Sequence, residues 1–102
     1  MKTKVFISQP MNGKSDDEIV KERNILIEKA KERYGDVEII DSFFKDAPHN
    51  AKPLWFLGKS LELLASADVA YFAKDWEKAR GCKIENQCAV EYGIEAVECY
   101  DY

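Results

Sequence analysis

The feature that most limits the fold of this chain is a nearly continuous apolar run from Val69 to Ala73. A strand that is apolar at successive positions has to be buried on both faces, which is typical of the interior of a parallel sheet. Parallel strands are joined by crossovers of helical length. This run therefore predicts an α/β protein in which helices cover both faces of a sheet.

Strand and helix patterns alternate along the rest of the chain. Runs of β-forming residues and helical periodicities follow one another as βαβαβαβ, and crossovers of this kind predict a parallel sheet. We expect a flavodoxin-like or Rossmann-like three-layer sandwich with a four-stranded sheet in the order 2-1-3-4. The strands are expected at residues 4–7, 37–40, 69–73 and 96–100.

The ends of the helices carry their own signals. Ser15 is followed by three acidic residues, so we expect it to cap the first helix, which Gly35 ends. Pro53 opens the second helix. The third helix follows Gly81 and ends near Gly93. These signals place one helix in each crossover.

Length and composition predict one domain, 1–102. The 102 residues are 46% hydrophobic and 33% charged, which is ordinary for a folded globular protein. A net charge of −4 argues against a nucleic-acid partner, and the short apolar runs argue against a membrane span. The first residues, Met1 to Lys4, pass directly into a strand without a signal-peptide core, so we expect a cytoplasmic protein.

The cysteines and the histidine predict neither a metal nor a cofactor. Cys82, Cys88 and Cys99 form no CxxC pair, and we interpret them as reduced thiols that pack as small hydrophobes. His49 is the single histidine of the chain. Because it has no Cys or His partner at ligand spacing, a zinc site is not expected.

Glu85 departs from the pattern of the third helix. At 100° per residue it falls near the middle of an apolar arc formed by Cys82, Ile84, Cys88, Ala89 and Tyr92. A carboxylate at the centre of a buried stripe is costly unless it is paired or used. Two readings stay open: a catalytic nucleophile, or a buried carboxylate held by Arg23 or Arg80.

Arg23 is the second charge on an apolar stripe, that of the first helix. Its long stem packs while its head reaches solvent, or its guanidinium points at an anionic ligand or at Glu85. We keep both readings and count Arg23 among the candidate binding residues.

Ligands of doubly wound sheets bind outside the carboxyl ends of the strands at the topological switch point. The loops 8–14 and 74–80 are expected to meet there. The first loop has the spacing of a Walker A motif, but Ser8 replaces its first glycine and Pro10 removes an amide donor, which disfavours nucleotide triphosphate hydrolysis. A more modest reading keeps Lys14 and Ser15 as a site for a small anion.

Three segments resemble the nucleoside 2-deoxyribosyltransferase-like family, above all its small branch of about this length. They are Ile7-Ser8-Gln9-Pro10-Met11-Asn12-Gly13, Ala67-Asp68, and Trp76 through Gly81 to Glu85 followed by Ala89 and Gly93. The resemblance covers nearly the whole chain, and its Gly-x-x-x-Glu step is the most informative part. It implies a flavodoxin-like fold, oligomers with shared active sites, and a glutamate at Glu85 that becomes glycosylated at the deoxyribose carbon. A second base then takes the sugar in the transferases, and water takes it in the related nucleotide hydrolases.

Three positions depart from the family's pattern. Transferases carry a tyrosine where this chain has Phe6, and aspartates where it has Ser60 and Ala79; the hydrolases have a serine at the last position. Asp75, expected at the carboxyl end of the third strand, is a candidate acid in their place, or else a turn residue that caps its own loop.

The candidate site collects residues from both switch-point loops. Trp76 stacks on a nucleobase or closes the edge of the pocket, and Arg80 binds a 5′-phosphate or neutralises Glu85. We take Glu85 and Asp75 as catalytic candidates. The substrate-binding candidates are Ser8, Gln9, Met11, Asn12, Gly13, Arg23, Trp76, Arg80 and Gly81.

The second helix is apolar on more than one side. We expect one stripe of Leu54, Leu57, Leu61, Leu64 and Ala65, with Trp55, Phe56 and Leu63 pointing elsewhere. A chain of this size can hardly bury both sides, so the helix at 53–66 predicts a homodimer or a higher homo-oligomer.

Together these features predict N-glycosidic bond cleavage or 2-deoxyribosyl transfer on a nucleoside or nucleoside monophosphate, with Glu85 as nucleophile. Two alternatives stay open. One is a non-catalytic nucleotide-binding domain that has lost the catalytic acids, and the other is an oligomeric module whose second helix serves only a partner.

Overall fold

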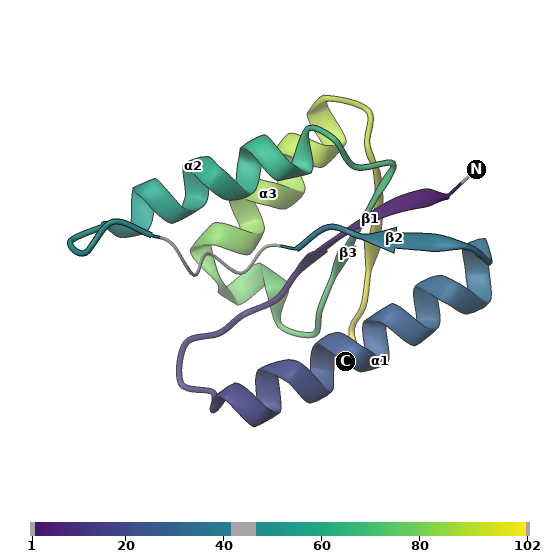
Figure 1. Cartoon of the computed structure of the whole chain (residues 1–102), viewed down its shortest axis with the longest axis horizontal. Helices are drawn as coiled ribbons and strands as arrows, with labels where there is room; N and C mark the ends of the chain where they lie inside the picture. Colours follow the sequence, from purple (N-terminus) through teal and green to yellow (C-terminus); the bar gives the residue numbers. More distant parts are fainter. Residues whose placement is uncertain (1, 42–46, 102) are drawn as a thin grey trace.

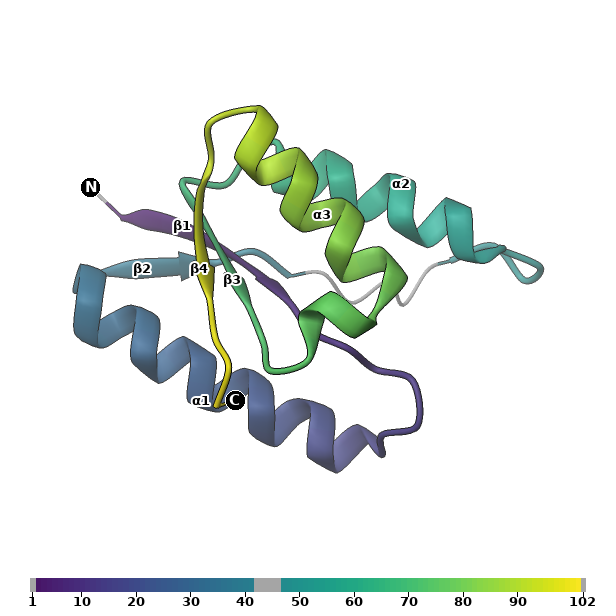
Figure 2. The same ribbon diagram turned by 180° about the vertical axis from the view of Figure 1, so that it is seen from behind.

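Four parallel strands form the centre of the computed structural model, which describes residues 2–41 and 47–101. They are β1 (Thr3–Ser8), β2 (Val37–Ile39), β3 (Val69–Phe72) and β4 (Glu95–Glu98), in the order β2-β1-β3-β4. Helix α1 (Asp16–Tyr34) covers one face of the sheet, and α2 (Pro53–Leu64) and α3 (Arg80–Glu91) cover the other (Figures 1 and 2). The expected flavodoxin-like three-layer fold and strand order are confirmed.

The two faces of β1 and β3 belong to two separate core clusters. Val5 and Ile7 face α1, where they pack with Leu26 and Ala30. The next residue in the alternation, Phe6, faces the other layer and packs with Leu64 of α2 and Ala89 of α3. Because side chains alternate along a strand, Ser8 lies on the same side as Phe6. The last residue of β1 thus faces the layer that contains Glu85.

Helix α1 begins and ends as the sequence predicts. The Ser15 hydroxyl accepts a hydrogen bond from the backbone N–H of Glu18 at 3.2 Å. The Glu18 carboxylate accepts one from the backbone N–H of Ser15, which completes a capping box. Gly35 follows the helix at φ +75°, a conformation that favours glycine. A short 3₁₀ helix, η1 (Trp76–Lys78), precedes α3.

The expected burial of two helices needs correction. Leu54 is 75% exposed, and in α2 only Leu64 is buried, because the first half of the helix borders cavities rather than the sheet. Leu63, expected to point elsewhere, packs against the second core cluster. Tyr92 is 83% exposed, because α3 ends one residue before it and the helical stripe ends with Ala89.

The remaining differences are small. Strand β4 begins at Glu95, one residue earlier than expected, and ends at Glu98. Part of the connection expected between Asp41 and Lys52 lies outside the described residues, which omit 42–46. Of the helices in the described part of the chain, none has the length and apolarity that a membrane crossing requires. The predicted oligomer through α2 stays a prediction.

Candidate active site

A cavity of about 340 Å³ lies at the carboxyl end of β1, between that strand and helices α2 and α3. Its size is within the range of small-molecule sites, and its position is the switch point of the sheet. Its wall is formed by Phe6, Ile7, Ser8, Gln9, Pro10, Met11, Phe56, Leu57, Ser60, Ala79, Gly81, Cys82 and Glu85. The structure therefore brings together five of the sequence-predicted site residues: Ser8, Gln9, Met11, Gly81 and Glu85.

Glu85 is buried in the wall of this cavity, with 8% of its surface exposed. The Ser8 hydroxyl donates a hydrogen bond of 2.6 Å to its Oε1 atom, and Ser60 of α2 lines the same cavity. Burial raises the pKa of Glu85, while the hydrogen bonds from Ser8 and Ser60 lower it. The structure thus pairs this carboxylate with the Ser8 hydroxyl, and neither Arg23 nor Arg80 lines the same cavity.

Cys82 lies one turn before Glu85 and also lines the cavity. Burial raises the pKa of its thiol to about 11, although a hydrogen bond with Ser8 acts in the opposite direction. The thiol is therefore protonated at neutral pH and is no nucleophile there. Of the described residues that line the cavity, Glu85 alone carries a carboxylate.

Two residues of the β1–α1 loop, Asn12 and Gly13, lie outside the cavity. Both are exposed in the turn that Lys14 closes by donating its backbone N–H to the Met11 carbonyl at 3.2 Å. Gly13 has φ +80°, so this turn suits glycine. The part of the loop that borders the cavity is its beginning, up to Met11.

Asp75 and Trp76 follow β3, as predicted, but neither lines the cavity. Asp75 has a left-handed backbone (φ 67°), and its carboxylate lies 3.4 Å from Lys78 Nζ. Trp76 packs against Phe72 of the second core cluster, with the ring centres 5.7 Å apart. The roles of Asp75 as acid and of Trp76 as a stacking residue stay predictions.

Arg80 borders a second cavity, of about 510 Å³, which shares Leu57 and Gly81 with the first. Lys52 lines the same cavity. These two cations stand at the beginnings of α2 and α3, and within the described residues neither helix has a side-chain cap or an acid in its first turn. The described lining of the second cavity thus carries two cations and no carboxylate, at the beginnings of two helices whose dipoles favour an anion.

Arg23 is 8% exposed, so its head does not reach solvent as one reading expected. Its Nη2 donates to the carbonyl of Ile40 at 3.2 Å, just after β2. Burial lowers the pKa of Arg23, and the charge of Asp41 raises it. Arg23 is not part of the cavity wall, and its hydrogen bond to Ile40 holds the chain just after β2.

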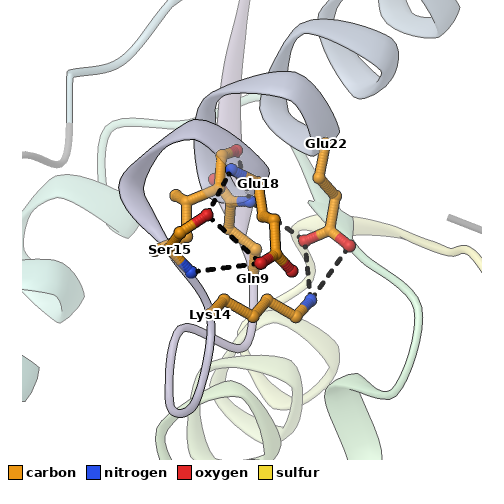
Figure 3. A network of polar contacts seen from close by, with 6 residues as sticks. Gln9, Lys14, Ser15, Glu18 and Glu22 are labelled. Carbon is orange, nitrogen blue, oxygen red and sulfur yellow. Dashed lines mark hydrogen bonds and ion pairs between the residues drawn. The ribbon is translucent and has the colours of Figure 1, made fainter.

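The small-anion reading of Lys14 and Ser15 does not fit the structure. Lys14 Nζ lies 3.1 Å from a carboxylate oxygen of Glu22, and Ser15 is engaged in the capping box with Glu18 (Figure 3). An anion at this helix end would meet acidic side chains instead of free donors.

Comparison with protein-family models, with curated proteins and with solved structures finds no match to this chain. Residues 2–41 and 47–101 contain no group of three or more His, Cys, Asp or Glu side chains placed to hold a metal ion. The site therefore has to be interpreted from its own geometry and chemistry.

Ser60 and Cys82 are site residues that the sequence analysis did not select. Ser60 is one of few polar residues in an otherwise apolar helix, and that contrast is a usable signal. Cys82 precedes Glu85 by three residues, a spacing that places two side chains on one helix face. Both face the cavity because α2 and α3 pack side by side.

Proposed function

We propose that this protein cleaves the N-glycosidic bond of a deoxynucleoside monophosphate, or transfers its 2-deoxyribosyl group, with Glu85 as nucleophile. The observation that carries the proposal is the buried Glu85 carboxylate, held by a serine hydroxyl in the wall of a ligand-sized cavity. The resemblance of the segments around Ser8 and Gly81 to the nucleoside 2-deoxyribosyltransferase-like family supports it.

The reaction follows from the chemistry of a poorly solvated carboxylate. Glu85 forms a C–O bond to the anomeric carbon while the C–N bond breaks, and the base leaves with the electron pair and takes up a proton from water. Water or a second base then attacks the same carbon and returns Glu85 as a carboxylate. Ser8 holds the carboxylate in one orientation during both steps.

The second cavity favours a phosphorylated ligand. Lys52 and Arg80 line it, and it shares Leu57 and Gly81 with the Glu85 cavity. A ligand whose sugar lies at Glu85 could therefore extend an anionic 5′-group past Gly81 toward the two cations. A Cβ built on Gly81 meets no atom within 4 Å, so this position offers open space between the cavities.

The base would lie against the apolar part of the first cavity. Met11 and Phe56 line that cavity and are exposed, and an aromatic side chain such as Phe56 offers a flat surface on which any nucleobase packs. This surface gives affinity for a base without selecting one.

A second candidate function is nucleotide binding without turnover. The observation that favours it is that Glu85 is the single carboxylate of the described cavity wall. Retaining glycosidases use two carboxyl groups, one as nucleophile and one as acid. If no other acid reaches the leaving base, the cavity binds a nucleotide and does not cleave it.

Incubation of the protein with the common deoxynucleosides and their 5′-monophosphates, with chromatography of the free base, tests the proposal. We expect base release from the monophosphates and its loss in Glu85→Gln. Glu91→Gln, an exposed change on the same helix, serves as the matched control and should keep full activity.

Three results separate the candidates. Equal release by wild type and Glu85→Gln would refute the nucleophile. Calorimetric binding of a monophosphate without base release would select the binding module. No binding of any nucleotide would refute both.

A further inference from the structure

Gln9 connects the Glu85 cavity to a polar network on α1. It follows Ser8 directly, lines the cavity and is 6% exposed. Its Nε2 donates to the Ile19 carbonyl at 3.1 Å and to Glu22 Oε1 at 3.0 Å (Figure 3). With both amide hydrogens taken, the orientation of the Gln9 amide is determined, and its oxygen is left as the acceptor.

The other end of the same loop reaches the same carboxylate. Lys14 Nζ donates to both oxygens of Glu22, at 3.3 and 3.1 Å. The side chains of Lys14 and Glu22 are only 26% and 17% exposed, so this ion pair is less screened by water than a surface pair. One carboxylate on α1 thus holds the first and the last residue of the loop Gln9–Lys14.

Glu18, one turn earlier on α1, has a different structural role. Its carboxylate accepts from the backbone and the hydroxyl of Ser15 and closes the capping box. Glu18 and Glu22 are therefore a matched pair of acids on one helix. The first stabilises the end of the helix, and the second holds the loop that borders the cavity.

We infer that Glu22 is a positioning residue for the site: it fastens Gln9 and Lys14 and so holds the cavity wall that begins at Gln9 in place beside Glu85. The ligand of this site rests on the proposed function, but the tether itself does not. Among the described hydrogen bonds of residues 9–14, loss of Glu22 leaves the turn closed by Lys14 and the Gln9–Ile19 bond. The wall formed by Gln9, Pro10 and Met11 is then free to move.

Two measurements test the tether without any ligand. The first is amide hydrogen exchange at the two ends of this stretch, the buried Gln9 and Lys14, whose N–H closes the turn. We expect it to become about five- to tenfold faster in Glu22→Ala, the factor that corresponds to one lost hydrogen bond. The second is a carbon NMR titration of the Glu85 carboxyl, which we expect to shift in Glu22→Ala because the loosened wall of Gln9, Pro10 and Met11 admits water to the cavity that Glu85 lines. Glu18→Gln should leave both unchanged, although it weakens the end of α1.

Two further variants separate the contribution of the Gln9 hydrogen bond from that of the Lys14 ion pair. Glu22→Gln keeps an acceptor for Gln9 and loses the charge that holds Lys14, so the Glu85 titration should return to that of the wild type. Lys14→Met should speed exchange only at the end of the loop. If Glu22→Ala does not fold, faster exchange at the end of the loop in Lys14→Met would still support the tether, and unchanged exchange there would refute it.

A ligand measurement connects the tether to the site. In calorimetry with the deoxynucleoside monophosphate that the wild type binds best, Glu22→Ala should raise Kd about five- to tenfold, and Glu18→Gln should not change it. If the wild type binds none, the proposed function fails, but exchange and titration still test the tether. Unchanged exchange and an unchanged Glu85 titration in Glu22→Ala would refute it.

Discussion

Removal of the Ser8 hydroxyl should show how strongly the fold depends on the hydrogen bond to Glu85. Ser8 is 2% exposed and Glu85 8% exposed, so water cannot easily replace the 2.6 Å bond between them. A hydrogen bond to a charged group contributes about 1.5–3 kcal/mol. We therefore expect Ser8→Ala to lower the free energy of unfolding by roughly that amount above the pKa of Glu85. For a domain of this size the loss lowers Tm by roughly 6 to 24 °C.

Urea denaturation followed by circular dichroism at several pH values provides the assay. The bond with Ser8 lowers the pKa of Glu85, so its removal raises that pKa further. The gap between wild type and Ser8→Ala should therefore be largest at high pH and narrow as the carboxyl becomes protonated. Once Glu85 is protonated, the difference in the free energy of unfolding should fall to the value of a neutral hydrogen bond, about 0.5–1.5 kcal/mol.

Ser66→Ala is the matched control for this experiment. The Ser66 hydroxyl donates to the Leu63 carbonyl at 2.8 Å, but at an exposed position. We expect its loss to change stability by no more than about 0.5 kcal/mol at any pH. If Ser8→Ala behaves like Ser66→Ala, or if its effect does not vary with pH, the account of the Ser8–Glu85 pair is wrong.

Three further predictions follow from the same geometry. Burial raises the pKa of Glu85, so the wild type loses stability as pH rises from the unfolded-state pKa to the folded-state pKa. Glu85→Gln should therefore be more stable than wild type at pH 8, by about 1.4 kcal/mol per unit by which the pKa is raised. Urea denaturation should show that this difference in the free energy of unfolding disappears below about pH 4. A gap that widens toward low pH would contradict this sign. The Cys82 thiol, with a pKa raised to about 11, should resist iodoacetamide at pH 8 in the native protein and react after unfolding, as peptide mass spectrometry would detect. Leu54→Glu, at a position 75% exposed, should dissociate the predicted homo-oligomer into monomers in light scattering and leave the thermal unfolding of the subunit intact; a wild type that is already monomeric would refute the oligomer.

The fold could be predicted largely because its determinants are local in the sequence. The alternation of strand and helix patterns, the apolar β3 and the capping box at Ser15 each depend on residues close together in the chain. The burial of α2 could not be predicted in the same way. An apolar helix indicates that something covers it, but the sequence does not say whether the sheet, a cavity or a second subunit does. The exposure of Leu54 in the single chain could therefore not be predicted.

The sequence by itself determined the fold class and the anomalous position of Glu85, because helical periodicity places a residue on a face without knowledge of its neighbours. Only the tertiary structure decided the partners of that residue. Ser8 lies 77 positions earlier in the chain and reaches Glu85 because alternation along β1 turns it toward the layer of α3. Arg23, the partner suggested by charge, meets Ile40 instead. Charge indicates which pairs are favourable, whereas the packing of sheet and helices determines which of them can meet.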